Sequence, residues 1–108
     1  MAAATPESRV KKRIKDALVT LQREGYPVWY YMPVPGRLSA PGIPDFICCI
    51  NGFFLAIEAK APGGTTTLIQ DITIDRIRAA NGHAIITVGA DTGPALVCIY
   101  NLAGKSHL

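Results

Sequence analysis

The sequence predicts one α/β domain, a mixed β-sheet flanked by helices, with its elements in the order α-β-β-β-α-β-α. The length of 108 residues suits a single domain with one hydrophobic core. Asn51-Gly52 joins two apolar runs, and this dipeptide between such runs is the strongest short-range signal of a β-hairpin. A helical pattern separates the third and fourth predicted strands, so a right-handed crossover can pair those two strands in parallel.

The composition indicates a globular protein. Hydrophobic residues make up 49% of the chain and charged residues 18%, which is too apolar for a disordered segment. No apolar run approaches the roughly 20 residues of a membrane-spanning helix, and the N-terminal residues lack the pattern of a secretory signal. Cys48, Cys49 and Cys98 lie in apolar runs, which predicts buried free thiols and a reducing, intracellular setting.

The first predicted helix starts with Thr5 as its N-cap and Pro6 at its first position. Gly25 is expected to end it. Its apolar residues recur at helical spacing and form one stripe: Val10, Ile14, Ala17, Leu18 and Leu21. Glu7 falls on the side of this stripe, where a carboxylate either complements the helix dipole or serves a site.

Three strands are predicted in the first half of the chain. Residues 28–32 are rich in aromatic and β-branched side chains, which favours a short strand. A loop follows at 33–42, because this segment holds three prolines and two glycines. The apolar runs 46–50 and 53–57 are then the two strands of the hairpin.

The second half predicts a helix, a strand and a final helix. Residues 65–67 offer N-caps for the helix, and Asn81-Gly82 closes it. Four apolar side chains are expected to face inward: Leu68, Ile69, Ile72 and Ile77. Residues 84–88 show no alternation, which predicts a buried strand. Residues 95–102 suit either a helix or an edge strand, and we favour the helix because a proline precedes them.

The register of the hairpin brings three charged residues together. A two-residue loop at Asn51-Gly52 makes the numbers of opposed residues sum to 103, so Asp45 is expected opposite Glu58. Directly opposed side chains share a face with Cβ atoms about 5 Å apart. Lys60 lies two residues beyond Glu58 and therefore points to the same face.

Two carboxylates at this distance repel each other, so they need a cation between them or one must take up a proton. One possibility is a structural salt bridge in which Lys60 joins Asp45 and Glu58. The other is a divalent metal, and carboxylate ligands without nearby Cys or His favour Mg²⁺ or Mn²⁺. In that case Glu7 could supply a third carboxylate, and Lys60 could act on the attacking water or the phosphate.

Basic residues concentrate near the N-terminus. The first 23 residues contain two acidic residues, Glu7 and Asp16, and six basic ones: Arg9, Lys11, Lys12, Arg13, Lys15 and Arg23. Such a patch attracts nucleic acid, although a solvated helix face is an equal alternative. The candidate nucleic-acid contacts are Lys11, Lys12, Lys15 and, in the loop, Arg37.

Around Asp45, Glu58 and Lys60 the sequence resembles a known nuclease family. Pro44-Asp45 followed by Glu58-Ala59-Lys60 matches the signature of the PD-(D/E)xK nucleases. The wider context resembles the VRR-NUC (virus-type replication–repair nuclease) domain from about Glu7 to Val88, which is most of the single domain of residues 1–108. That context consists of Glu7, Gly42-Ile43-Pro44-Asp45, Ile57 to Lys60, Gln70 and Gly82.

The resemblance implies a restriction-endonuclease-like core and an endonuclease that uses Mg²⁺ or Mn²⁺ to hydrolyse DNA phosphodiesters. Asp45, Glu58 and the backbone carbonyl of Ala59 would hold the metal, and Glu7 would complete the acidic site. Lys60 would act at the water or the phosphate, and Gln70 would belong to the active site. The sequence departs from the family in its threonine-rich segment before Gln70, which bears on how Gln70 is aimed.

The resemblance also implies a biological setting. Stand-alone members are similar to phage proteins, so the expected location is the cytoplasm of a phage-infected bacterial host. Some act as homodimers on branched DNA such as a four-way (Holliday) junction, and two sites related by a two-fold axis suit that substrate. The apolar segment 95–102 could be the dimer face. The alternative from another class is an inactive nucleic-acid-binding or interaction module with a structural Asp-Glu-Lys cluster.

Overall fold

The computed structural model describes residues 5–34, 40–89 and 91–106, and it confirms the predicted order of elements. In these ranges no helix combines the length and apolar character needed to span a membrane. The elements are α1 (Pro6–Arg23), β1 (Val28–Tyr31), β2 (Phe46–Ile50), β3 (Phe53–Lys60), α2 (Leu68–Ala79), β4 (His83–Val88) and α3 (Gly93–Ala103).

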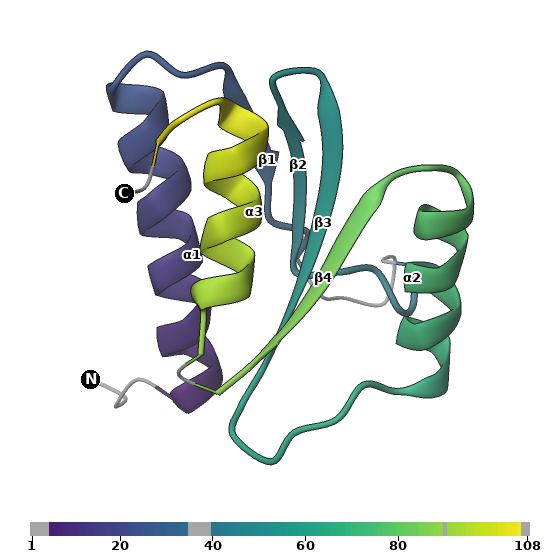
Figure 1. Ribbon diagram of the computed structural model, residues 1–108. Helices are drawn as coiled ribbons and strands as arrows, with labels where there is room; N and C mark the ends of the chain where they lie inside the picture. The colour runs from purple at the N-terminus through teal and green to yellow at the C-terminus, as the bar shows by residue number, and fades with distance from the viewer. Residues whose placement is uncertain (1–4, 35–39, 90, 107–108) are drawn as a thin grey trace.

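The strands form one mixed sheet in the order β1-β2-β3-β4. The first two neighbouring pairs are antiparallel, and β3 pairs with β4 in parallel through the crossover that contains α2. Figure 1 shows α1 and α3 side by side on one face of the sheet and α2 on the other. The predicted mixed sheet flanked by helices is therefore confirmed.

The hairpin has the predicted register. Phe46 pairs with Ile57 and Ile50 pairs with Phe53, so opposed numbers sum to 103 along the whole ladder. Asn51 and the following glycine both have positive φ angles, 52° and 83°, as a type I′ turn requires. The second strand begins at Phe46, which places Asp45 just before the ladder rather than inside it.

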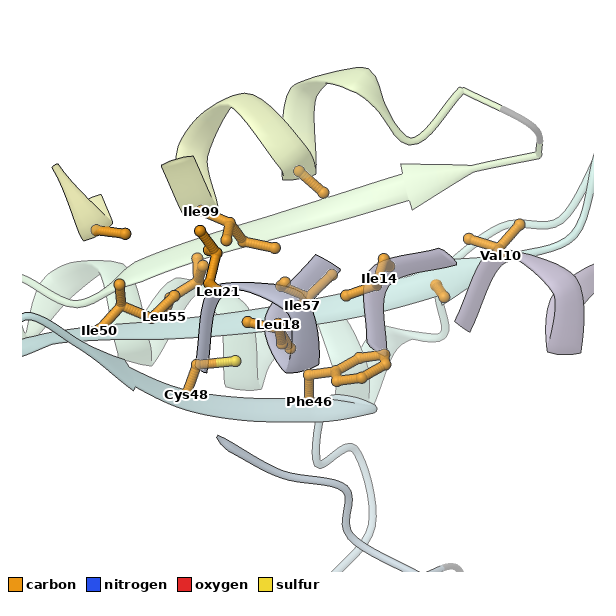
Figure 2. Packing of buried hydrophobic residues seen from close by; sticks show 13 residues of the cluster. Val10, Ile14, Leu18, Leu21, Phe46, Cys48, Ile50, Leu55, Ile57 and Ile99 are labelled. Carbon is orange, nitrogen blue, oxygen red and sulfur yellow. The ribbon is translucent and has the colours of Figure 1, made fainter. Parts of the chain in front are cut away.

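The larger core lies between the sheet and the helices α1 and α3. Figure 2 shows Ile14, Leu18 and Leu21 of α1 gathered with Phe46 and Ile57 of the sheet. All five side chains have no exposed surface. Burying a side chain of this size contributes roughly 1.5–3 kcal/mol. This packing fixes α1 against the sheet, with its N-terminal half near the open end of the hairpin.

The face covered by α2 is only partly buried. Ile74 packs on the sheet residues Ala56 and Ala84, but the predicted inward residues Leu68, Ile69 and Ile72 are 75%, 49% and 44% exposed. That part of the prediction is wrong, although Ile77 does pack against this cluster. Helical spacing identifies residues that share a face, and only the later turns of that face lie over the sheet.

Three further expectations concern the end of the chain and the thiols. Residues 95–102 are helical within α3, as predicted. The side chains of α3 that are buried in the core are Ala95, Ile99 and Ala103. The strand β4 is not fully buried, because it is the edge of the sheet and Val88 is 44% exposed. Cys49 is exposed, contrary to prediction, whereas burial raises the pKa of the Cys48 thiol to about 12.

Candidate functional site

A cleft of about 440 Å³ opens where α1, the segment before β2, the end of β3 and the start of α2 meet. Its apolar walls come from segments 33–34 and 40–44. Its polar lining consists of six side chains: Glu7, Lys11, Asp45, Glu58, Lys60 and Gln70. The five side chains that the sequence singles out as catalytic therefore lie around one cleft, and Lys11 joins them.

Glu58 lies deepest in the site. It sits near the end of β3 and is only 3% exposed. Its Oε1 accepts a hydrogen bond of 3.0 Å from Gln70 Nε2 and lies 3.2 Å from Lys60 Nζ. Its Oε2 is buried and has no hydrogen-bond partner among the described residues. One oxygen of this carboxylate is thus held by two donors and the other has none.

The surroundings of Glu58 raise the pKa of its carboxyl. Burial is the main reason that its pKa lies above the ordinary value, and the negative charge of Asp45 adds to the effect. The ion pair with Lys60 lowers the pKa but does not outweigh these two causes. The repulsion expected between the two carboxylates is therefore present.

Asp45 is held by different partners from those predicted. Its Oδ2 accepts a 2.8 Å hydrogen bond from the backbone N–H of Ala59, and its Oδ1 lies 3.2 Å from Lys11 Nζ. A single salt bridge through Lys60 is not formed, since the two carboxylates have separate lysines. The carboxylate also satisfies the backbone of a residue that has no exposed surface.

We predict that Asp45→Ala destabilises the fold more than Asp45→Asn. Alanine leaves the buried Ala59 N–H without an acceptor, which costs about 1–3 kcal/mol, whereas the asparagine carbonyl can still accept it. Both variants lose the carboxylate that pairs with Lys11. Urea unfolding of both in EDTA measures the difference, and equal stabilities would show that the Ala59 hydrogen bond contributes little.

Gln70 connects the start of α2 to the site. Its Oε1 accepts a 2.9 Å hydrogen bond from the N–H of Thr67, while Thr67 Oγ1 accepts one of 3.2 Å from the N–H of Gln70. This reciprocal pair is a capping box, with Thr67 as the N-cap. The threonine-rich segment therefore provides a regular helix start, and the remaining amide donor of Gln70 points to Glu58.

The turn before Asp45 is fitted closely to α2. Gly42 has a φ of 78°, and a Cβ atom there would lie 2.8 Å from the backbone oxygen of Ile69. A side chain at this position would meet both an unfavourable backbone conformation and the first turn of α2. The Ile69 side chain, which is half exposed, thus lies against Gly42 of this turn. The segment that carries Asp45 is thus located by the helix that carries Gln70.

Glu7 lies at the rim of the cleft. Its side chain is 43% exposed, and its Oε1 is 3.8 Å from Lys11 Nζ, one helical turn away. Among the described residues, no three His, Cys, Asp or Glu side chains are grouped so that they could hold a metal ion. Glu7 lines the same cleft as the other two carboxylates, and Lys11 contacts both Glu7 and Asp45. The predicted role of Glu7 as a third acidic ligand stays a prediction.

The predicted nucleic-acid contacts have different environments. Lys12 pairs with Asp16 at 2.7 Å and is 74% exposed, so it lies on a solvated face. Lys15 lines a shallow depression of about 350 Å³ together with Lys11 and Lys12. Arg37 lies outside the described residues. Sequence reasoning placed Lys11 on the nucleic-acid face alone, although its position four residues after Glu7 already indicated a pair within the helix.

The donor set fits a hard divalent cation. Glu58 Oε2 is unpartnered, and Asp45 Oδ1 is held by a lysine that is 31% exposed. Two carboxylates with no described histidine or cysteine lining the cleft are the ligands that Mg²⁺ or Mn²⁺ prefers. The predicted role of the Ala59 carbonyl stays a prediction.

No protein-family model matches the chain, and no similar sequence was found among curated proteins. The motif residues and the contacts that they make in the cleft are the features that indicate a function.

Proposed function

We propose that the protein is a Mg²⁺- or Mn²⁺-dependent endonuclease of the VRR-NUC type, with a restriction-endonuclease-like core. Its substrate is DNA, and its reaction is hydrolysis of a phosphodiester bond. The observation that carries this proposal is the buried Glu58, whose free carboxylate oxygen lies in a cleft shared with Asp45 and Lys60. A buried acid with a raised pKa beside a second acid is typical of a functional site rather than of a core.

Asp45 and Glu58, with the Ala59 carbonyl, are the groups that would hold the ion. Such an ion would neutralise the two carboxylates, lower the pKa of a coordinated water and stabilise negative charge on phosphate oxygens. The protein contributes fixed ligand positions, because the Ala59 N–H orients Asp45 and the Gln70 amide orients Glu58. Such secondary contacts set both ligand geometry and affinity.

Lys60 is the group that we assign to the reacting phosphate or its attacking water. It is 15% exposed, and its ion pair with Glu58 keeps the ammonium in the cleft. A preorganised donor of this kind stabilises charge that develops in the transition state. The basic depression formed by Lys11, Lys12 and Lys15 adjoins this cleft and would hold the DNA backbone without reading sequence.

The proposal extends to branched DNA and to a homodimer. Each copy would contribute one acidic cleft, so two copies related by a two-fold axis would present two cleavage sites to a four-way junction. That segment 95–102 forms the dimer face stays a prediction. Its Val97 side chain is 43% exposed and is therefore available for such a contact.

A second candidate is a nucleic-acid-binding module with a structural cluster. The observation that favours it is the pairing of each carboxylate with its own lysine, Asp45 with Lys11 and Glu58 with Lys60. In that case DNA is bound and never cut.

The test is a cleavage panel. Purified protein with Mn²⁺ is incubated with single-stranded, duplex, flap and four-way-junction DNA, and parallel reactions contain EDTA or the Asp45→Asn variant. We expect metal-dependent cleavage that is fastest on a branched substrate and absent in both controls. Binding to the same DNA without cleavage at any Mn²⁺ concentration would instead support the binding module.

A further inference from the structure

Lys11 is the charged residue of the cleft that the nuclease motif does not explain. Its ammonium lies 3.2 Å from Asp45 Oδ1 and 3.8 Å from Glu7 Oε1. It therefore neutralises the carboxylate oxygen that a metal would need, while the other oxygen of Asp45 is engaged by the Ala59 N–H. In the absence of a metal, Lys11 is the cation at this position.

The position of Lys11 allows it to leave Asp45 without losing contact with the protein. Its side chain is 31% exposed and borders two cavities, the acidic cleft and the basic depression that Lys12 and Lys15 also line. A lysine stem has four carbons and flexible torsions, so the ammonium can move between neighbouring partners. Its pair with Asp45 is partly exposed, and such pairs are weak.

We propose that Lys11 is an exchangeable counter-ion: a divalent cation displaces it from Asp45, and the freed ammonium then binds a DNA phosphate along the basic depression. This inference rests on the proposed function and adds a regulatory residue to it. Glu58, a residue 97% buried, supports the exchange because its Oε2 has no hydrogen-bond partner among the described residues and could serve as a second ligand oxygen. Lys11 thereby sets metal affinity and links metal binding to DNA binding.

Two consequences follow from the exchange. Removing the ammonium should tighten metal binding, because the cation no longer competes with Lys11 for Asp45. Metal and DNA should also bind with positive coupling in the native protein, since the metal releases a lysine that DNA can use. Linkage requires that coupling to be reciprocal, so either ligand can be titrated to measure it.

In the experiment, the full chain is titrated with Mn²⁺, and binding is measured by calorimetry and by thermal shift. The three proteins are wild type, Lys11→Met and Lys12→Met. Methionine keeps most of the stem and removes the charge. Lys12 is the matched control because it is the next residue of α1 but pairs with Asp16 and does not line the acidic cleft. We expect the Kd for Mn²⁺ to fall about three- to fivefold in Lys11→Met and to stay within about twofold in Lys12→Met.

A second measurement tests the link to DNA. Two proteins are compared, Lys60→Ala and the double variant Lys60→Ala/Lys11→Met, because the loss of Lys60 keeps the DNA substrate intact. The DNA affinity of each is measured in the presence and in the absence of Mn²⁺. The gain in DNA affinity on adding Mn²⁺ should shrink by at least about twofold when Lys11 is absent. An equal gain in both proteins would overturn the proposed coupling.

The outcomes separate this inference from the proposed function. Unchanged or weaker Mn²⁺ binding in Lys11→Met would overturn the exchange while leaving the metal site intact. Equal tightening in Lys11→Met and Lys12→Met would also overturn it, because the effect would then come from net charge alone. If wild type binds no Mn²⁺ at all, both the exchange and the proposed function fail.

Discussion

Lys60→Ala is expected to lower the rate of Mn²⁺-dependent DNA cleavage by at least about a hundredfold while DNA binding stays within a few fold. Loss of one preorganised donor to a developing negative charge typically costs a factor of 10²–10³. Lys60 also lowers the pKa of Glu58, so its removal raises that pKa further and favours the protonated carboxyl, a poorer metal ligand. Single-turnover cleavage and a separate binding assay measure the two effects.

Lys105→Ala is the matched control for this change. Lys105 also has one carboxylate partner, Glu24, at 2.7 Å, but it lies at the end of α3 and outside the cleft. The Lys105→Ala variant should cleave DNA at the wild-type rate. If Lys60→Ala also cuts at that rate, Lys60 has no role in the reaction, and the assignment of the cleft as a nuclease site loses its main mechanistic support.

Glu58→Gln is expected to raise the melting temperature of the metal-free protein by several degrees at pH 7.5 while abolishing stabilisation by Mn²⁺. The wild-type carboxylate is 3% exposed, with one oxygen unpartnered, and burial with the nearby Asp45 charge raises its pKa. Glutamine removes the buried charge and keeps an oxygen that can accept from Gln70. For a domain of about 100 residues, each kcal/mol gained corresponds to about 4–8 °C.

The pH dependence gives this prediction its sign. Because the folded state binds the Glu58 proton more tightly than the unfolded chain, stability falls as pH rises from the ordinary carboxyl pKa through the raised one. The gain from Glu58→Gln should therefore vanish near pH 4, where the wild-type carboxyl is protonated in both states. Glu24→Gln, which removes an exposed carboxylate, should show no such gain. A destabilised Glu58→Gln at pH 7.5 would contradict the argument.

The hairpin was predictable because its register depends on local chemistry. Asn51-Gly52 restricts the turn to one type, and that turn fixes which residues oppose each other over the five pairs that follow. The position of Glu58 and Lys60 on one face follows from the alternation of side chains along a strand, which is also local. The capping role of Thr67 was likewise readable from the sequence, since N-caps act within a single turn.

The partners of Asp45 were not predictable in the same way. Lys11 reaches it because the packing of α1 on the sheet sets the height of the helix relative to β3, and no local pattern encodes that distance. The Ala59 hydrogen bond arises because β2 begins only at Phe46, so the Ala59 N–H bonds to the side chain of Asp45 instead of to a strand backbone. The exposure of Leu68 was missed for a related reason, since periodicity does not show how far a helix extends beyond its sheet.

The capping box of α2 has a consequence for the thermal stability of the cleft. Gln70 holds both the first turn of that helix and the carboxylate of Glu58, and α2 itself is anchored by Ile74 as its one fully buried described residue. A helix with so little buried surface opens at a lower free energy than the core beneath α1. Each such opening releases Glu58 from its amide donor. We therefore expect the arrangement of Gln70 and Glu58 to be lost at a lower temperature than the packing beneath α1.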